Sequence, residues 1–175
     1  MKYIIDFDHT LLDTECLKES TSRDERGHLV GTPEFWEHYC GTNFLFPDVL
    51  PWIESKGKEA LHILTAFKPS QGPLAKDFQE AKLKSGDFSE LVASVTVMEG
   101  LKGEVAAGIA QQFPPEEPVV FIDDRIDQCL SVKEALPHCH CFLITRYNVC
   151  PSEFSDTITQ VSSLAEVDVI MNERL

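Results

Sequence analysis

The sequence predicts an α/β protein in which a parallel β-sheet is covered by helices on both faces. Short apolar segments recur along the chain, and stretches with helical spacing of apolar residues alternate with the later ones. Parallel strands need long crossover connections, usually helices, so this alternation is typical of a parallel sheet. The ligand site of such a sheet lies beyond the carboxyl ends of its strands. Acidic residues follow two of the apolar segments, which places candidate chemistry at that edge.

Each element is predicted from its apolar pattern and from the residues that end it. Five apolar segments are expected to be strands: 3–6, 61–64, 92–97, 119–122 and 141–144. Helices are expected at 47–56, 71–84, 102–113, 127–136 and about 162–173. Gly57 and Gly86 follow two of these helices, and Pro114 and Pro137 end two others.

The chain is expected to form one domain over residues 1–175, with a small helical, cap-like insertion at 13–45. The insertion and the segment just after it are rich in aromatic residues. These are Phe35, Trp36, Tyr39, Phe44 and Phe46. They either line a substrate entrance or pin a small helical flap to the body, and the sequence leaves both interpretations open.

The charge balance excludes some partners. The 175 residues include 29 acidic and 15 basic side chains, a net charge of −14, which disfavours nucleic acid and anionic membrane surfaces. No run approaches the roughly 20 apolar residues of a membrane span, and no secretory leader is recognisable. We therefore expect a cytoplasmic location and reduced thiols for the six cysteines. The sequence does not indicate the oligomeric state.

The sequence disfavours a second metal site near residue 140. The run from His138 to Cys141 alternates histidine and cysteine, the side chains that bind zinc. However, Cys141 begins an expected strand, on which neighbouring side chains point to opposite faces. Such a run does not converge on one ion.

The most informative motif is Asp6-Phe7-Asp8-His9-Thr10, at the end of the first apolar segment. Alternate residues of a strand point the same way, so Asp6 and Asp8 begin on one face. Two carboxylates about 4 Å apart repel by about 4 kcal/mol at an effective dielectric constant of about 20. A hard dication such as Mg²⁺, which prefers oxygen ligands, relieves that repulsion.

Three further signals follow in order along the chain. Thr65-Ala66 comes after the second apolar segment, Lys102 opens a helix, and Asp123-Asp124 ends the fourth segment. Each alone has an ordinary explanation as a cap, a solvated lysine or a helix start. Together they form an ordered set of acid pair, threonine, lysine and acid pair at one sheet edge.

This ordered set resembles the four motifs of the haloacid dehalogenase-like hydrolase superfamily, in its phosphatase-type form with a minimal cap. The resemblance covers residues 2 to about 146, except for the insertion. It implies a Rossmann-like three-layer α/β/α fold with a five-stranded parallel sheet of order 5-4-1-2-3. In that order the first and fourth strands are neighbours, so the two acid pairs meet at one metal ion.

The resemblance also implies a role for each motif. Asp6 attacks phosphorus to form an aspartyl-phosphate, and Asp8 protonates the leaving alcohol and then activates water. Mg²⁺ is held by the carboxylate of Asp6, the backbone carbonyl of Asp8 and the pair Asp123 and Asp124, with Asp124 the expected direct ligand. The phosphoryl oxygens are bound by Thr65, Lys102 and the amides of Phe7, Asp8 and Ala66.

The expected function is therefore Mg²⁺-dependent hydrolysis of a small phosphate monoester. Dehalogenases of the family lack an acid at the position of Asp8, because a halide leaves without a proton. Crowding by Asp6 is expected to favour the protonated form that Asp8 needs. A catalytically idle binding or regulatory module is the alternative, and a receiver-type phosphoacceptor is disfavoured because its acids, threonine and lysine follow a different order. His9 replaces a frequent glycine, and its role is left open.

Overall fold

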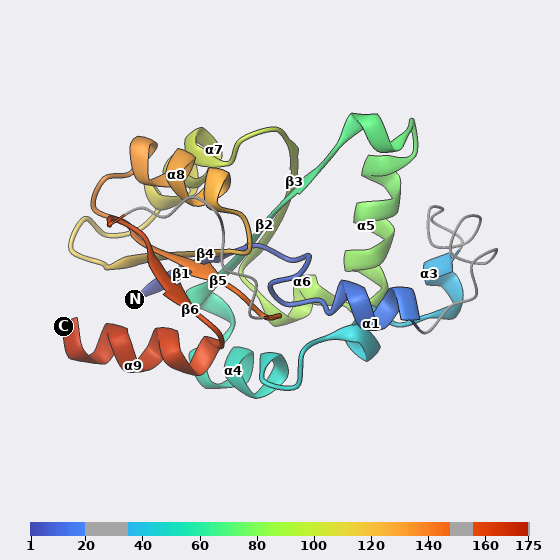
Figure 1. Cartoon of the computed structure of the whole chain (residues 1–175), viewed down its shortest axis with the longest axis horizontal. Helices are drawn as coiled ribbons and strands as arrows, with labels where there is room; N and C mark the ends of the chain where they lie inside the picture. Colours follow the sequence, from blue (N-terminus) through green and yellow to red (C-terminus); the bar gives the residue numbers. More distant parts are fainter. Residues whose placement is uncertain (20–34, 148–155, 175) are drawn as a thin grey trace.

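A computed structural model describes residues 1–19, 35–147 and 156–174 (Figure 1). Its centre is one parallel sheet of order β3-β2-β1-β4-β5-β6. The strands are β1 (Lys2–Ile5), β2 (Leu61–Phe67), β3 (Ser94–Glu99), β4 (Val119–Asp123), β5 (His140–Ile144) and β6 (Thr159–Val161). The five expected strands and their order are confirmed, but the expected count is wrong, because β6 adds a sixth strand beside β5.

Helices cover both faces of this sheet, as expected. The helices are α1 (Thr14–Glu19), α3 (Phe35–His38), α4 (Val49–Lys56), α5 (Ala75–Ser85), α6 (Phe88–Leu91), α7 (Gly103–Ala110), α8 (Ile126–Ala135) and α9 (Leu164–Arg174). In Figure 1, α7 and α8 lie above the sheet and α4 and α9 lie below it. The result is a three-layer α/β/α fold.

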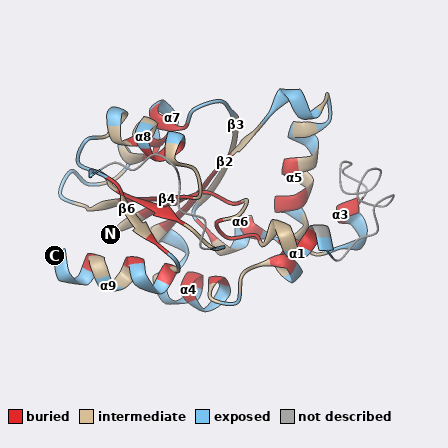
Figure 2. Ribbon diagram, viewed as in Figure 1, coloured by how far each residue is buried: buried red, intermediate tan, exposed pale blue. Residues whose placement is uncertain are grey.

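The alternation of side chains along β1 divides the core into two layers. Tyr3 and Ile5 pack into the layer that includes residues of α4 and α9, whereas Ile4 packs into the layer under α7 and α8. Figure 2 shows the central strands buried between the two helical layers. A parallel sheet with both faces buried accounts for the apolar strands of the sequence.

Strand β2 is longer than expected, and this changes the setting of the threonine motif. Thr65 and Ala66 do not follow the strand but belong to it, paired with Val97 and Met98 of β3. On its other side β2 pairs with β1 only as far as Ile63. The last residues of β2 therefore face the end of β1, where the acid motif begins.

The described part of the insertion packs against the body of the protein. The side chains of Phe35, Trp36 and Phe44 are buried, and the ring of Trp36 lies 5.9 Å from that of Phe78 on α5. These contacts favour the interpretation in which the aromatic residues pin the insertion. Residues 20–34, the middle of the proposed cap, lie outside the described residues. Among the described helices, none has the length and apolarity that a membrane crossing requires.

The side chain of Arg146, which is 6% exposed, ties the loop after β1 to the rest of the fold. The guanidinium of Arg146 donates to both carboxylate oxygens of Asp48, at 2.9 and 2.8 Å, and to the carbonyl of Thr10, at 3.0 and 2.9 Å. The same carboxylate accepts from the amide of Leu164 at the start of α9. Arg146 also stacks on Phe46, with its guanidinium carbon 4.5 Å from the ring centre.

We predict that Arg146→Met lowers the free energy of unfolding by about 2 kcal/mol, because it leaves Asp48 and the Thr10 carbonyl without this donor. Urea unfolding monitored by tryptophan fluorescence measures the change. Lys58→Met, which removes an exposed ion pair with Glu90 at 3.8 Å, is the control and is expected to cost less than about 1 kcal/mol. Equal losses in the two variants would contradict the assigned role of Arg146.

Candidate active site

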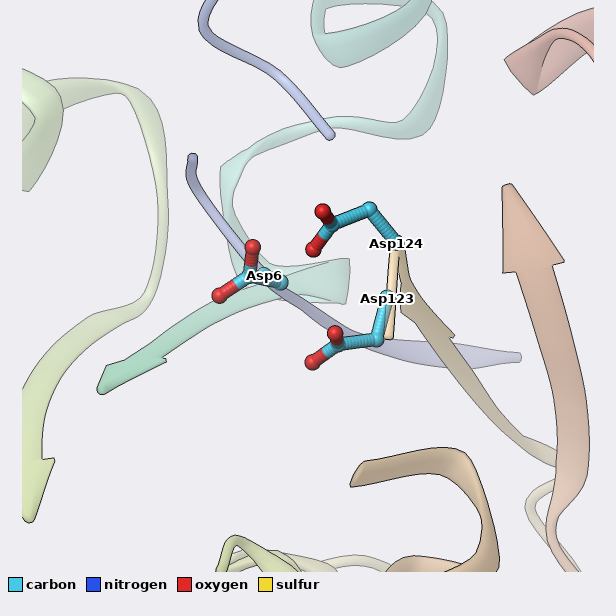
Figure 3. Close-up of side chains that lie close together, drawn as sticks. All are labelled: Asp6, Asp123 and Asp124. Carbon is cyan, nitrogen blue, oxygen red and sulfur yellow. The ribbon is translucent and has the colours of Figure 1, made fainter. Parts of the chain in front are cut away.

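Three aspartates converge at the carboxyl edge of the sheet. Strands β1 and β4 are paired neighbours, with Ile5 opposite Ile122, so the residues that follow lie side by side. Ligand atoms of Asp6, Asp123 and Asp124 all lie within 4.8 Å of one another (Figure 3). Of the first acid pair, Asp6 therefore lies beside both acids of the second pair, whereas the carboxylate of Asp8 is not one of these three.

Lys102 lies among these three aspartates. Lys102 is 1% exposed, and its ammonium donates to Asp6 Oδ1 and, at 2.7 Å, to Asp123 Oδ2. Its backbone amide donates to Oε1 of Gln128 at 2.9 Å. This hydrogen bond attaches the turn that precedes α7 to helix α8. Gly103 allows this close approach, because a Cβ there would lie 2.4 Å from the carbonyl oxygen of Ser131.

The packing of acids around one lysine shifts their protonation. Burial raises the pKa of Asp6 from an ordinary 3.8 to about 7, against the attraction of Lys102. Burial also raises the pKa of Asp123 to about 6. Burial and then the charge of Asp6 raise the pKa of Asp124 to about 7. Burial alone would lower the pKa of Lys102, but Asp123 and Asp6 raise it. The lysine is therefore charged, while the carboxyls hold more negative charge than it balances.

This donor set fits a hard divalent cation. Three carboxylates within reach of one point supply the oxygen ligands that Mg²⁺ prefers. Both oxygens of Asp123 already accept hydrogen bonds, Oδ2 from Lys102 and Oδ1 from the amide of Arg125 at 2.9 Å. Asp124 is only partly buried and lines the adjoining cleft. Asp124 and Asp6 are thus better placed than Asp123 as direct ligands.

Asp8 lies in the same cleft, but its environment differs from the one expected. Its Oδ1 accepts from the ammonium of Lys82, and its Oδ2 accepts from the side-chain amide of Gln79 at 2.7 Å. Burial would raise the pKa of Asp8, but Lys82 and these hydrogen bonds hold it below its ordinary value. The expectation that crowding by Asp6 favours a protonated Asp8 is therefore wrong for this state of the protein.

Three of the five phosphate-binding candidates line a cleft of about 330 Å³. Asp6, Asp8, Ala66 and Lys102 line it. Thr65 is buried behind this surface, where its hydroxyl oxygen accepts from Gln79 at 2.8 Å. The ring of Phe7 packs into the core, so only its backbone can serve the site. The amides of Phe7 and Asp8 lie beyond the last paired residue of β1.

His9 has a left-handed backbone, with φ of 56°, which explains why a glycine suits this position. His9 lines the cleft and also a neighbouring hollow of about 300 Å³, which Tyr147 lines as well. The rings of His9 and Tyr147 are 6.4 Å apart.

Three cleft residues were missed by the sequence reasoning: Gln79, Lys82 and Gln128. Each is at most 5% exposed. Glutamine and lysine are usually exposed, so their presence on a helix gives no local sign of burial. The only available signal was the spacing of Gln79 and Lys82, which places both on one helical face.

Comparisons with known proteins identify the fold. No protein-family model and no curated protein sequence matches the chain. Among solved structures, a protein described as a haloacid dehalogenase-like hydrolase from Burkholderia xenovorans LB400 matches with a TM-score of 0.68 at 15% identity, covering 98% of this chain and 96% of that chain. A dehalogenase matches with a TM-score of 0.60 at 15% identity, covering 97% of this chain and 96% of the other. The D,D-heptose 1,7-bisphosphate phosphatase of B. bronchiseptica, complexed with magnesium and phosphate, matches with a TM-score of 0.58 at 14% identity over 100% of both chains.

These matches establish that the chain has the fold of the haloacid dehalogenase-like hydrolases, confirming the expected fold. The identities are low, and the matched proteins include both a dehalogenase and a phosphatase. The reaction must therefore be argued from the site residues rather than from the fold.

We predict that Mg²⁺ stabilises this protein more at about pH 8 than at about pH 5.5. The raised pKa values mean that the metal-free fold favours protonated carboxyls, so this contribution to stability is complete below about pH 4 and is lost as the pH rises to about 7. Protons compete with the metal below that pH. At ten times its Kd, Mg²⁺ should raise Tm by about 3–6 °C in differential scanning fluorimetry.

Asp124→Asn should abolish the shift, whereas Asp127→Asn should retain it, because Asp127 is paired with Arg125 outside the cluster. A Mg²⁺ response that survives in Asp124→Asn would contradict the assigned ligand.

Proposed function

We propose that this chain, which has the fold of the haloacid dehalogenase-like hydrolases, is a magnesium-dependent phosphatase. Its substrate is a small phosphate monoester, and its intermediate is an aspartyl-phosphate at Asp6. The observation that carries the proposal is the meeting of Asp6, Asp124 and Lys102 with a second acid, Asp8, in one cleft.

The position of Asp6 suits a nucleophile. Its Oδ1 is held by Lys102, and the carboxylate faces a cleft large enough for a phosphoryl group. In the first step an oxygen of Asp6 forms a bond to phosphorus as the ester P–O bond breaks. Lys102 offsets the charge that opposes the approach of a carboxylate to a phosphate dianion. Bound Mg²⁺ would supply further charge neutralisation at the phosphoryl oxygens.

Asp8 donates and accepts the protons that the two steps require. The departing alkoxide takes a proton from Asp8. In the second step Asp8 takes a proton from water as the water attacks phosphorus, and the carboxylate of Asp6 leaves with its oxygen restored. Asp8 is ionised in the free protein, which suits the second step. A bound phosphate dianion raises the pKa of Asp8 again by repulsion, which prepares the first step.

The presence of Asp8 favours a phosphatase over a dehalogenase. A halide leaves without a proton, so a dehalogenase has no use for an acid at this point in the cleft. Two buried side chains, Gln79 and Lys82, donate hydrogen bonds to Asp8. The net charge of −14 supports a small phosphate ester rather than a nucleic-acid end as the substrate.

We predict that the purified protein releases phosphate from a panel of phosphate monoesters in the presence of Mg²⁺, measured as inorganic phosphate. Asp6→Asn should lower kcat/KM by at least about 10³-fold because it removes the nucleophile. Asp8→Asn should lower it by about 10²–10⁴-fold for alkyl phosphates. Asp127→Asn is the matched control and should retain activity.

A second arm tests the same site without turnover. Beryllium fluoride with Mg²⁺ should stabilise the wild type but not Asp6→Asn, because it mimics a phosphoryl group on that carboxylate. If the wild type shows neither turnover nor this response, the catalytically idle module is the better interpretation. Chloride release from haloacids without phosphate release would favour a dehalogenase.

A further inference from the structure

We propose that Lys82 and Gln79 of α5 are positioning residues that hold the Asp8 carboxylate in its catalytic orientation and link it to Thr65. This inference rests on the proposed phosphatase function, since it assigns the two residues to that reaction. Neither residue belongs to the motifs that indicated the fold.

The contacts of Asp8 leave its side chain little freedom. Lys82 donates to one carboxylate oxygen, and Gln79 donates to the other at 2.7 Å. A carboxylate bound through both oxygens has its rotation fixed as well as its position. Each oxygen still has a lone pair for a proton, so the carboxyl group remains able to act on a substrate.

Lys82 is itself held in place by its surroundings. It is 3% exposed, and its ammonium lies 5.4 Å from the ring centre of Phe7 and 5.6 Å from that of Phe78. Turning Asp8 away would leave a buried ammonium without its carboxylate, which costs far more than an exposed ion pair gains. The buried Lys82 therefore restrains Asp8 more strongly than an exposed lysine would.

Gln79 also contacts Thr65 of β2, a proposed phosphate-binding residue. Its side-chain amide donates both to Asp8 and, at 2.8 Å, to the hydroxyl oxygen of Thr65. That hydroxyl then keeps its own proton to donate elsewhere. Because Gln79 and Lys82 are three residues apart on one helix, the position of α5 sets both contacts together. The proton-transfer group and the proposed phosphate-binding group are thus placed by the same helix.

This role predicts a dependence on the leaving group. A phenolate such as p-nitrophenolate is weakly basic and departs without a proton, whereas an alkoxide requires one from Asp8. The value of kcat/KM reports on the steps from substrate binding to departure of the alcohol. The value of kcat also includes hydrolysis of the aspartyl-phosphate, in which Asp8 acts as a base.

The test compares p-nitrophenyl phosphate with 2-phenylethyl phosphate, which has a similar size and an alkyl leaving group. In Lys82→Met, kcat/KM for 2-phenylethyl phosphate should fall at least about tenfold, while that for p-nitrophenyl phosphate should change less than about threefold. With p-nitrophenyl phosphate, kcat and KM should fall together. Gln79→Met should show the same pattern with smaller changes.

Two comparisons separate positioning from general damage. Lys56→Met removes a partly buried lysine paired with Asp168 at 2.6 Å, on α4 and away from the cleft, and should leave both substrates unaffected. In an Asp8→Asn background, Lys82→Met should change kcat/KM less than about twofold, because Lys82 acts through Asp8.

Several results would overturn the inference. Equal losses for both substrates would indicate a structural effect, and multiplicative losses in the double variant would indicate direct action of Lys82 on the substrate. An Asp8 side chain unmoved in the crystal structure of Lys82→Met would also refute it, whatever the activity. If the wild type hydrolyses no phosphate ester, the proposed function fails instead, which is a distinguishable outcome.

Discussion

The ammonium of Lys102 is the constraint on which the site depends, because it is a buried cation placed between two buried carboxylates, Asp6 and Asp123. With Asp124 the cluster carries three acids and one base. Two ionised carboxylates about 4 Å apart repel by about 4 kcal/mol at an effective dielectric constant of about 20, so one lysine cannot balance all three. Burial, together with this excess of negative charge, raises the pKa values of Asp6 and Asp124 to about 7, so the fold can relieve the excess by binding protons. A dication relieves it more completely, so one geometry accounts both for the shifted acids and for the proposed metal.

The order of the strands brings these groups together. Asp6 and Asp123 are far apart in the sequence, yet they end neighbouring strands, and Lys102 enters from the start of α7. The second lysine reaches the cleft from α5, whose contacts extend to both β2 and β3. Each group therefore comes from a different connection at one edge of the sheet. The remaining surface can stay strongly acidic because the two cations that the chemistry needs are buried and already paired.

The sequence predicted the parts of this arrangement that have local signals. Acids after apolar strands and a lysine opening a helix are visible in short windows, and their order indicated both the fold and the sheet topology. Strand β6 was missed because only one of its three residues, Val161, is strongly apolar. The extension of β2 was missed because Thr65 and Ala66 resemble a strand end until β3 is placed beside them. Lys82 was missed because its burial depends on Asp8, 74 residues earlier in the chain, and no local pattern reports that pairing.

The expectation for Asp8 was wrong for a related reason, and correcting it clarifies the proposed mechanism. Asp6 and Asp8 were treated as a repelling pair, but Asp8 is paired with Lys82, which holds its pKa below the ordinary value. The four aspartates and the two buried lysines paired with them, Lys82 and Lys102, carry a net charge of −2 when all are ionised. The cleft is also lined by Lys68, which is exposed, and by Arg125, which is paired with Asp127. Mg²⁺ held by these aspartates would neutralise this set of six side chains, and a phosphate dianion would then add negative charge. A phosphate dianion bound beside Asp8 would raise the pKa of that carboxyl by repulsion, at the point where the leaving alcohol needs a proton. In this scheme the lysines fix the geometry of the carboxylates, while the charge of the bound substrate controls when Asp8 holds a proton.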